Sequence, residues 1–215
     1  MLTSPFFNRN AVIVAQELIG KVIQHKYKNI WLKAQVIETE AYLKEEKASH
    51  SSLGYTEKRK ALFMPPGTIY MYYSRGKDTF NISVGDEGDA VLIKAGVPFI
   101  EDETDSKMIE VMKNLNPLTD QIRETHKLCS GQTLLTKSLN LKVPDWDQKQ
   151  FHKDSLLIKH IDYIPTKIIQ TTRLGIPKGR DEHLMYRFVD YEHADKCTKN
   201  PLTKNKIEGK DYYIH

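Results

Sequence analysis

Two carboxylates and a tyrosine alternate along one predicted strand near the start of the chain. The residues from Trp31 to Tyr42 are mostly apolar or β-branched, which predicts a strand in which Glu38, Glu40 and Tyr42 share one face. Unless a bulge shifts the register, that face also carries three aliphatic residues, Leu32, Ala34 and Val36. A carboxylate on an apolar face is costly unless it is paired. We therefore expect Glu40 to be either a desolvated general base beside an aromatic ring or part of a buried ion pair with a neighbouring strand.

Aromatic and basic residues surround a predicted hairpin farther along the chain. Residues 68–74 form a tyrosine-rich strand in which Tyr70 and Tyr72 share a face and Tyr73 points away. Tyrosines in sheets usually serve packing, but such a face can also stack a planar ligand. The turn that follows contains Arg75 and Lys77, which could meet phosphates or enter a groove, or could form an ordinary solvated turn.

Two further polar side chains could contact a ligand. His50 lies in a long polar loop over residues 44–60, without the HxH or HExxH spacing of a metal site. Asn81 lies on the opposite strand face from Phe80 and Ile82. Its amide can donate to and accept from the edge of a base, or bond to the backbone. Neither residue is specific to a function by itself.

The elements that must position these residues follow an α+β pattern. We expect a first helix over residues 10–19, capped by Asn10 and stopped by Gly20. Strands are expected over residues 21–28, 31–42, 68–74, 79–84 and 90–95, with short ones near 156–158, 167–171 and 186–190; further helices are expected near 100–113, 118–128 and 132–139. We therefore predict one α+β domain over residues 1–215, with residues 196–215 as a loosely held tail.

Composition narrows the class of protein. The chain has 215 residues, no apolar run near the roughly 20 residues that cross a bilayer, and no signal-peptide pattern at its start. Two cysteines, Cys129 and Cys197, provide neither a disulfide framework nor a thiolate zinc site. We expect an intracellular protein without membrane contact. The net charge of +4, from 32 Lys and Arg against 28 Asp and Glu, permits a polyanionic partner without requiring one.

Taken in order, these segments resemble the alkyladenine (3-methyladenine) DNA glycosylase family. The matching segments are Glu38-Thr39-Glu40-Ala41-Tyr42-Leu43, Ala48-Ser49-His50-Ser51, Phe63-Met64-Pro65-Pro66-Gly67-Thr68-Ile69-Tyr70-Met71-Tyr72, Asn81-Ile82-Ser83, Ala90-Val91-Leu92-Ile93-Lys94-Ala95, Leu128-Cys129-Ser130-Gly131 and Arg173-Leu174-Gly175-Ile176. They occur in the family's order as far as about Phe188. The ordered set is specific, although each segment alone is weak.

The resemblance implies a compact domain with a curved antiparallel sheet flanked by helices. It also implies hydrolysis of the bond between a damaged purine and deoxyribose in double-stranded DNA, without a metal or organic cofactor. Glu40 falls on the general base that activates water. The residues that fall on the pocket for the extruded base are Tyr42, His50, Tyr72, Asn81 and Leu92. Among them, Asn81 falls on the amide that the family uses to disfavour guanine.

Two positions depart from the family pattern. Arg75 stands where the family often has an aromatic wedge; it can plug the vacated stack with its guanidinium plane and pair with phosphate, but the apolar wedge is lost. Tyr73 is an alternative plug. Lys94 stands where an Arg that contacts DNA is common, and it keeps only the charge. No Lys of this set matches a Schiff-base nucleophile, so we expect no strand-cleaving lyase step.

Two other functions stay open at this point. A non-catalytic nucleic-acid-binding module of related fold is one, although a pure binder gains nothing from an anion at Glu40 beside its ligand's phosphates. A small-molecule glycosidase is the other; it would need a second carboxylate, for which Glu38 is available. For the glycosylase, we expect a monomer located in the cytoplasm or nucleoid of a bacterium or the nucleus of a eukaryote.

Overall fold

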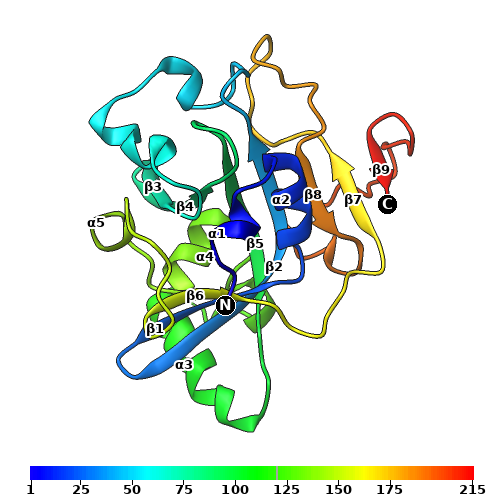
Figure 1. Ribbon diagram of the computed structural model, residues 1–215. Helices are drawn as coiled ribbons and strands as arrows, with labels where there is room; N and C mark the ends of the chain where they lie inside the picture. Colours follow the sequence, from blue (N-terminus) through cyan, green and yellow to red (C-terminus); the bar gives the residue numbers. More distant parts are fainter. Residues whose placement is uncertain (120) are drawn as a thin grey trace.

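The long strand β2, Ile30–Tyr42, runs through the middle of the computed structural model, which describes residues 1–119 and 121–215 (Figure 1). It pairs with β1, Val22–Tyr27, with β5, Ala90–Pro98, and with β8, Arg187–Asp190. All three pairings are antiparallel. The strand that carries Glu38, Glu40 and Tyr42 is therefore held on both sides, which fixes the direction of its side chains.

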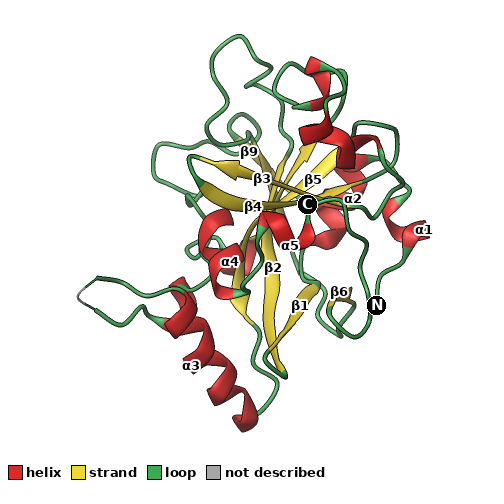
Figure 2. Cartoon of the chain, turned by 90° about the vertical axis from the view of Figure 1, so that its left-hand side faces the viewer, coloured by secondary structure: helices red, strands yellow, loops and turns green. Residues whose placement is uncertain are grey.

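These strands belong to a sheet that has nine strands among the described residues. Seven of them follow the order β3-β4-β5-β2-β8-β7-β9, β1 pairs with β2 outside this order, and β6 pairs with β1. The remaining strands are β3, Ile69–Ser74, β4, Lys77–Ser83, β6, Leu156–Lys159, β7, Ile168–Thr171, and β9, Tyr212–Ile214. The pairings between these strands are all antiparallel, and the strands fan out from the middle of the molecule (Figure 2). The predicted α+β class and antiparallel sheet are confirmed, and the predicted strands match to within a few residues.

Helices pack around this sheet. The α-helices are α1, Ser4–Phe7, α2, Ala11–Leu18, α3, Ser106–Leu115, α4, Gln132–Ser138, and α5, Val143–Trp146; the 3₁₀ helices are η1, Ser51–Leu53, η2, Glu57–Phe63, η3, Glu103–Asp105, η4, Thr125–Lys127, and η5, Tyr191–His193. Helix α2 packs on β2, β5 and β8, α3 on β2, and α4 on β4 and β5. Among the described residues, none of the helices has the length and hydropathy to cross a membrane.

The first predicted helix is confirmed with its cap. The Asn10 side chain accepts a hydrogen bond from the Val12 amide at 2.9 Å, and Gly20 follows the helix end with a φ of +83°. The face of α2 that lies against the sheet consists of Ala11, Val14, Ala15 and Leu18, all buried. Thr39 of β2 donates to the Ala15 carbonyl at 2.7 Å, so the odd-numbered residues at the end of β2 face α2.

Strand β2 contains a β-bulge, the exception that the sequence analysis allowed for. In its pairing with β5 the register shifts around Glu38, and Ile37 has no opposite residue. Val36 belongs to the core cluster under α2, whereas Ile37 packs in a second cluster with Ala95 and Val189. The extra residue of the bulge reverses the sheet face on which the following side chains lie. Glu38 and Glu40 therefore lie on the opposite face from Leu32, Ala34 and Val36. The unshifted count that placed all of them on one face is wrong.

Two other expectations differ from the structure. The helix predicted over residues 118–128 is replaced, in the described part, by the single turn of η4; residue 120 lies outside the described residues. The segment expected to be a loose tail returns to the sheet, because β9 pairs with β7 and the Thr198 amide donates to Glu38 at 2.8 Å. Its contacts are made with partners far away in sequence, which local composition does not indicate.

Candidate active site

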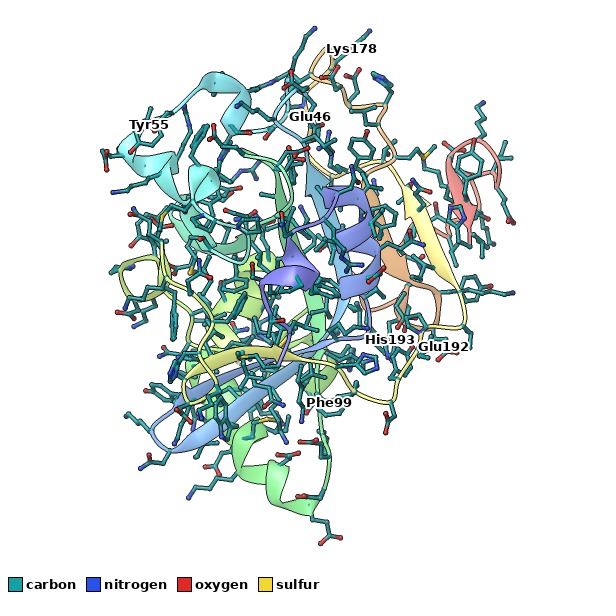
Figure 3. All side chains as sticks on the ribbon, in the orientation of Figure 1. Glu46, Tyr55, Phe99, Lys178, Glu192 and His193 are labelled. Atoms are coloured by element: carbon teal, nitrogen blue, oxygen red, sulfur yellow. The ribbon has the colours of Figure 1, made fainter. Side chains whose placement is uncertain are left out.

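A cleft of about 820 Å³ opens over the end of β2. Its walls come from the loop after β2, the β3–β4 hairpin, β5, the start of α4 and the loop after β7. The loops after β2 and β7 lie together at the top of the molecule, where Glu46 and Lys178 mark them (Figure 3). Seven predicted site residues line the cleft: Tyr42, His50, Tyr72, Arg75, Asn81, Leu92 and Lys94. Segments far apart in sequence thus converge on one site.

Glu40 is fully buried directly behind the cleft wall. Its Oε2 atom accepts a hydrogen bond from the Tyr42 hydroxyl at 2.7 Å, and its Oε1 atom accepts one from the Leu174 amide at 3.1 Å. The Lys94 Nζ atom lies 3.3 Å from Oε1. All three partners line the cleft. A carboxylate can accept about four hydrogen bonds, and these three contacts use three of those positions.

The ion pair expected as the alternative role of Glu40 is therefore present, because Lys94 of the neighbouring strand β5 supplies the cation. The Lys94 side chain is 11% exposed and reaches the cleft, whereas that of Glu40 is 0% exposed. Lys94, expected from the sequence to contact DNA, lines the cleft as the partner of Glu40, and its contact with DNA stays a prediction. A buried carboxylate without a counterion would be strongly destabilising, so Lys94 stabilises Glu40 where it lies.

Tyr42 is supported from behind by a second buried ion pair. The Arg173 guanidinium lies 4.6 Å from the centre of the Tyr42 ring, forms a bidentate pair with Glu46, and donates to the Ala41 carbonyl at 2.8 Å. Neither Arg173 nor Glu46 lines the cleft. Burial, and next the Glu40 charge, raise the pKa of Tyr42 well above its ordinary value. Its hydroxyl therefore stays protonated near neutral pH and donates to Glu40.

One wall of the cleft is aromatic. The rings of Tyr70 and Tyr72 stack with centres 5.4 Å apart, and the His50 ring lies edge-on to Tyr72 at 4.6 Å. The Tyr70 hydroxyl is hydrogen-bonded to His50 Nδ1 at 2.9 Å. Burial, followed by the charges of Arg59 and Arg180, lowers the pKa of His50. The wall is therefore uncharged at neutral pH and presents ring faces and edges to the cleft.

Asn81 and Leu92 continue this site across the sheet. Asn81 lies opposite Leu92 in the β4–β5 pairing, and Leu92 lies opposite Glu40 in the β5–β2 pairing. The three side chains therefore form a row on one face of the sheet. The Asn81 Nδ2 atom donates to the Tyr70 carbonyl at 3.1 Å, so the backbone bond considered from the sequence is present and fixes the amide beside the cleft.

The two predicted DNA plugs lie differently. Arg75 and Gly76 form the two-residue turn between β3 and β4 with φ values of +51° and +74°, the geometry of a type I′ hairpin. Arg75 lines the mouth of the cleft. Tyr73 is 57% exposed and is not among the residues that line the cleft. Of the two, the structure brings only Arg75 to the site.

Glu38 serves the fold and not the cleft. Its two oxygens accept from Arg187 Nε at 2.6 Å and from the Thr198 amide at 2.8 Å, and it is fully buried away from the cleft lining. Glu38 therefore does not supply the second carboxylate that the small-molecule glycosidase hypothesis requires, and that assignment of Glu38 is wrong; among the described residues, no Asp or Glu lines the cleft. Among the described residues, no group of three or more His, Cys, Asp or Glu side chains could hold a metal ion.

Sequence reasoning missed several contributors to the site. Leu174 acts through its backbone amide, which a residue type does not indicate. Arg173 and Glu46 are charged residues whose pairing only the fold establishes. The motif Arg173-Leu174-Gly175-Ile176 was a usable signal, because it belongs to the ordered set of segments. Tyr70 shares a face with Tyr72 in the sequence and forms part of the same wall.

Comparisons with known proteins show the family of this chain. A family model described as methylpurine-DNA glycosylase (MPG) matches residues 5–194. A Pseudomonas aeruginosa (strain UCBPP-PA14) protein named "Putative 3-methyladenine DNA glycosylase" is 54% identical over 214 residues, which cover 99% of this chain and 90% of the relative. Proteins of the same name from Pseudomonas savastanoi pv. phaseolicola (54% over 212 residues, 98% and 95% covered) and Clostridium beijerinckii (33% over 183 residues, 82% and 88% covered) are also similar. The chain belongs to the methylpurine-DNA glycosylase family, whose members are hydrolases of DNA base excision repair.

Proposed function

We propose that this protein extrudes an alkylated purine from double-stranded DNA and hydrolyses its N-glycosidic bond with a water molecule activated by Glu40. The product is an abasic site and a free base. One observation carries the proposal: a desolvated carboxylate lies behind an aromatic cleft, and all three of its polar partners line that cleft. A binding module has no use for this arrangement, because an anion there repels the phosphates of its ligand.

The aromatic wall supports the binding step. Extruding a nucleotide costs a few kcal/mol, and stacking on aromatic rings returns about 1–3 kcal/mol per base. The rings of Tyr42, Tyr72 and His50 all line the cleft. A base made cationic by alkylation is attracted to electron-rich rings. Because the pKa of His50 is lowered, its neutral ring does not repel that cation.

The contacts of Glu40 support the chemical step. As the glycosidic bond stretches, positive charge develops on the sugar, and the nearby carboxylate stabilises it. Water attacks the anomeric carbon and passes a proton to Glu40, while the bonding electron pair leaves with the base and neutralises its charge. We expect the water at the fourth acceptor position of the carboxylate, beside the Lys94 ammonium.

The remaining residues of the row support selection of the base. The Asn81 amide is held by the Tyr70 carbonyl and cannot easily turn aside for the exocyclic amino group of guanine. Leu92 is 2% exposed beside it and provides an apolar contact. Normal guanine is therefore excluded by a fixed polar group, and alkylated purines are selected by charge and by their weaker glycosidic bond.

We propose a monofunctional enzyme. Lys94 brings an amine to the cleft floor, but as an ammonium paired with Glu40 it has no lone pair with which to attack the sugar. The expected product is thus an intact strand with an abasic site. We further propose that the protein acts as a monomer on chromosomal DNA, hence in the nucleoid if its source is bacterial like these relatives.

The test is a lesion panel in duplex DNA. Oligonucleotides methylated with dimethyl sulfate are incubated with the wild-type protein, and the free purines and the cleaved strands are measured separately. We expect methylated purines in solution and no strand cleavage before alkali treatment. Borohydride should trap no covalent complex. Binding of methylated DNA without any purine release would instead favour the non-catalytic module.

A further inference from the structure

The loop after β2 carries an apolar tip at the lip of the cleft. Leu53 and Tyr55, on either side of Gly54, are 60% and 54% exposed. Leu53 also lines the cleft, and a Cβ atom at Gly54 would meet nothing within 4 Å. The tip therefore projects from the molecule, as the outward position of Tyr55 shows (Figure 3). Leu53 and Tyr55 together form a small exposed apolar patch beside the cleft, and exposed apolar patches mark sites of interaction.

The backbone of this tip is braced. Arg59 Nη1 donates to the carbonyls of Leu53 and Gly54 at 3.2 and 3.0 Å. The Leu53 amide donates to the His50 carbonyl at 3.3 Å, which ties the tip to the aromatic wall of the cleft. A side chain presented on a fixed backbone loses little conformational freedom when it is buried in a partner. These hydrogen bonds therefore hold the Leu53 side chain in a fixed position relative to His50, ready to be buried in a partner.

Charge on both lips fits a DNA backbone. Residues 57–60 follow the tip and contain three cations, Lys58, Arg59 and Lys60, against one anion, Glu57. On the other lip, Arg75 and Lys77 lie at the β3–β4 turn and line the cleft. An apolar side chain flanked by cations is the arrangement by which proteins unstack and kink DNA through the minor groove.

We propose that Leu53 is the apolar wedge of this protein: it enters the base stack of damaged duplex DNA and fills the space that the extruded nucleotide leaves. Arg75, on the opposite lip, contacts the phosphate backbone. This inference rests on the proposed glycosylase function. It also explains how the chain acts without an aromatic residue at Arg75, since Tyr73 lies away from the cleft lining. Leu53 is a positioning residue, because it touches the DNA stack and not the reacting bond.

The test separates the wedge from the chemistry. An oligonucleotide with a single adenine is methylated with dimethyl sulfate and used in three forms: single-stranded, paired with thymine, or paired with a pyrene nucleoside that itself fills the stack. Release of 3-methyladenine is measured under single-turnover conditions for the wild type, Leu53→Ala and Leu53→Met. Ile164→Ala is the matched control, because Ile164 is 77% exposed and is not a cleft residue.

We expect Leu53→Ala to slow release from the thymine-paired duplex by about 10- to 100-fold, the change that burial of one leucine side chain corresponds to. Release from the single strand should stay near that of the wild type, and pyrene should restore release from the duplex. Leu53→Met and Ile164→Ala should behave like the wild type. An equal loss on single and double strands, no loss at all, or no rescue by pyrene would overturn the inference.

The two proposals fail in different ways. A wild-type protein that releases no purine from any of the three substrates contradicts the glycosylase function and, with it, the wedge. A wild-type protein that releases the purine while Leu53→Ala releases it equally fast from duplex contradicts the wedge alone. The salt dependence gives a further contrast: loss of the Arg75 charge should flatten it, and loss of the Leu53 side chain should not.

Discussion

Tyr42→Phe is the substitution that isolates a single contact of the proposed base. It removes the hydroxyl that donates to Glu40 Oε2 at 2.7 Å and leaves the ring, with Arg173 4.6 Å from its centre, in place. A hydrogen bond to a charged group contributes about 1.5–3 kcal/mol. If that energy orients the carboxylate in the transition state, it corresponds to about 10- to 150-fold in rate.

The lower part of this range is the expected result. Two of the three contacts of Glu40, those with Leu174 and Lys94, stay in place and hold Oε1. We therefore expect single-turnover release of methylated purine from duplex DNA to slow by about tenfold for Tyr42→Phe. The affinity for the methylated duplex should change little, because the stacking surface is intact.

The assay needs binding and rate measured on the same substrate. Tyr213→Phe is the matched control, since Tyr213 is 43% exposed on β9 and is not a cleft residue. A Tyr42→Phe protein that releases purine as fast as the wild type would refute the idea that this hydroxyl positions the base. A variant that loses affinity instead of rate would refute it as well.

The other predictions concern the charges around the cleft. Lys94→Met removes the counterion of the buried Glu40 carboxylate, so the melting temperature of the protein should fall clearly. Lys94→Arg keeps the positive charge and should melt close to the wild type. Equal melting temperatures for Lys94→Met and the wild type would contradict the pairing. Arg75→Ala should slow the release of methylated purine more from duplex DNA than from single strands. It should also reduce, by about one, the slope with which the logarithm of the DNA-binding constant falls with the logarithm of the salt concentration. Equal effects on both substrates would argue against a DNA contact. Because the pKa of His50 is lowered, its ring is neutral above about pH 6.5 and gains charge only as the pH falls below the lowered pKa. Release of a cationic base should therefore decline on the acid side, and pH profiles should show a smaller decline for His50→Gln; identical profiles would contradict this role.

The resemblance to the glycosylase family supplied most of the predicted site residues, and strand periodicity supports the placement of some of them. Glu40 and Tyr42 share a face, as do Ala90, Leu92 and Lys94, and these alternations survive in the structure. What strand pairing adds could not be predicted. The sequence does not state that Leu92 lies between Asn81 and Glu40, or that Lys94 of β5 meets Glu40 of β2.

The errors have the same origin. The bulge at Ile37 reverses the face on which the last side chains of β2 lie. This bulge depends on the register between β2 and β5, which the composition of β2 alone does not determine. Glu38 and Glu40 look equivalent in sequence, yet one is paired with Arg187 and the other lies behind the cleft. Residues 196–215 look polar and loose, but they contact partners distant in sequence, including Glu38 and β7. Long-range contacts decided each of these outcomes.

The most direct test of the central claim is single-turnover purine release by Glu40→Gln. The amide keeps the size of the side chain but cannot take a proton from water or stabilise the developing charge on the sugar, so we expect release from methylated duplex DNA to fall by about 1,000-fold or more. Binding of the same duplex should persist, and Glu45→Gln, an exposed neighbour, should act like the wild type. A Glu40→Gln protein that releases methylated purine at the wild-type rate would contradict the account.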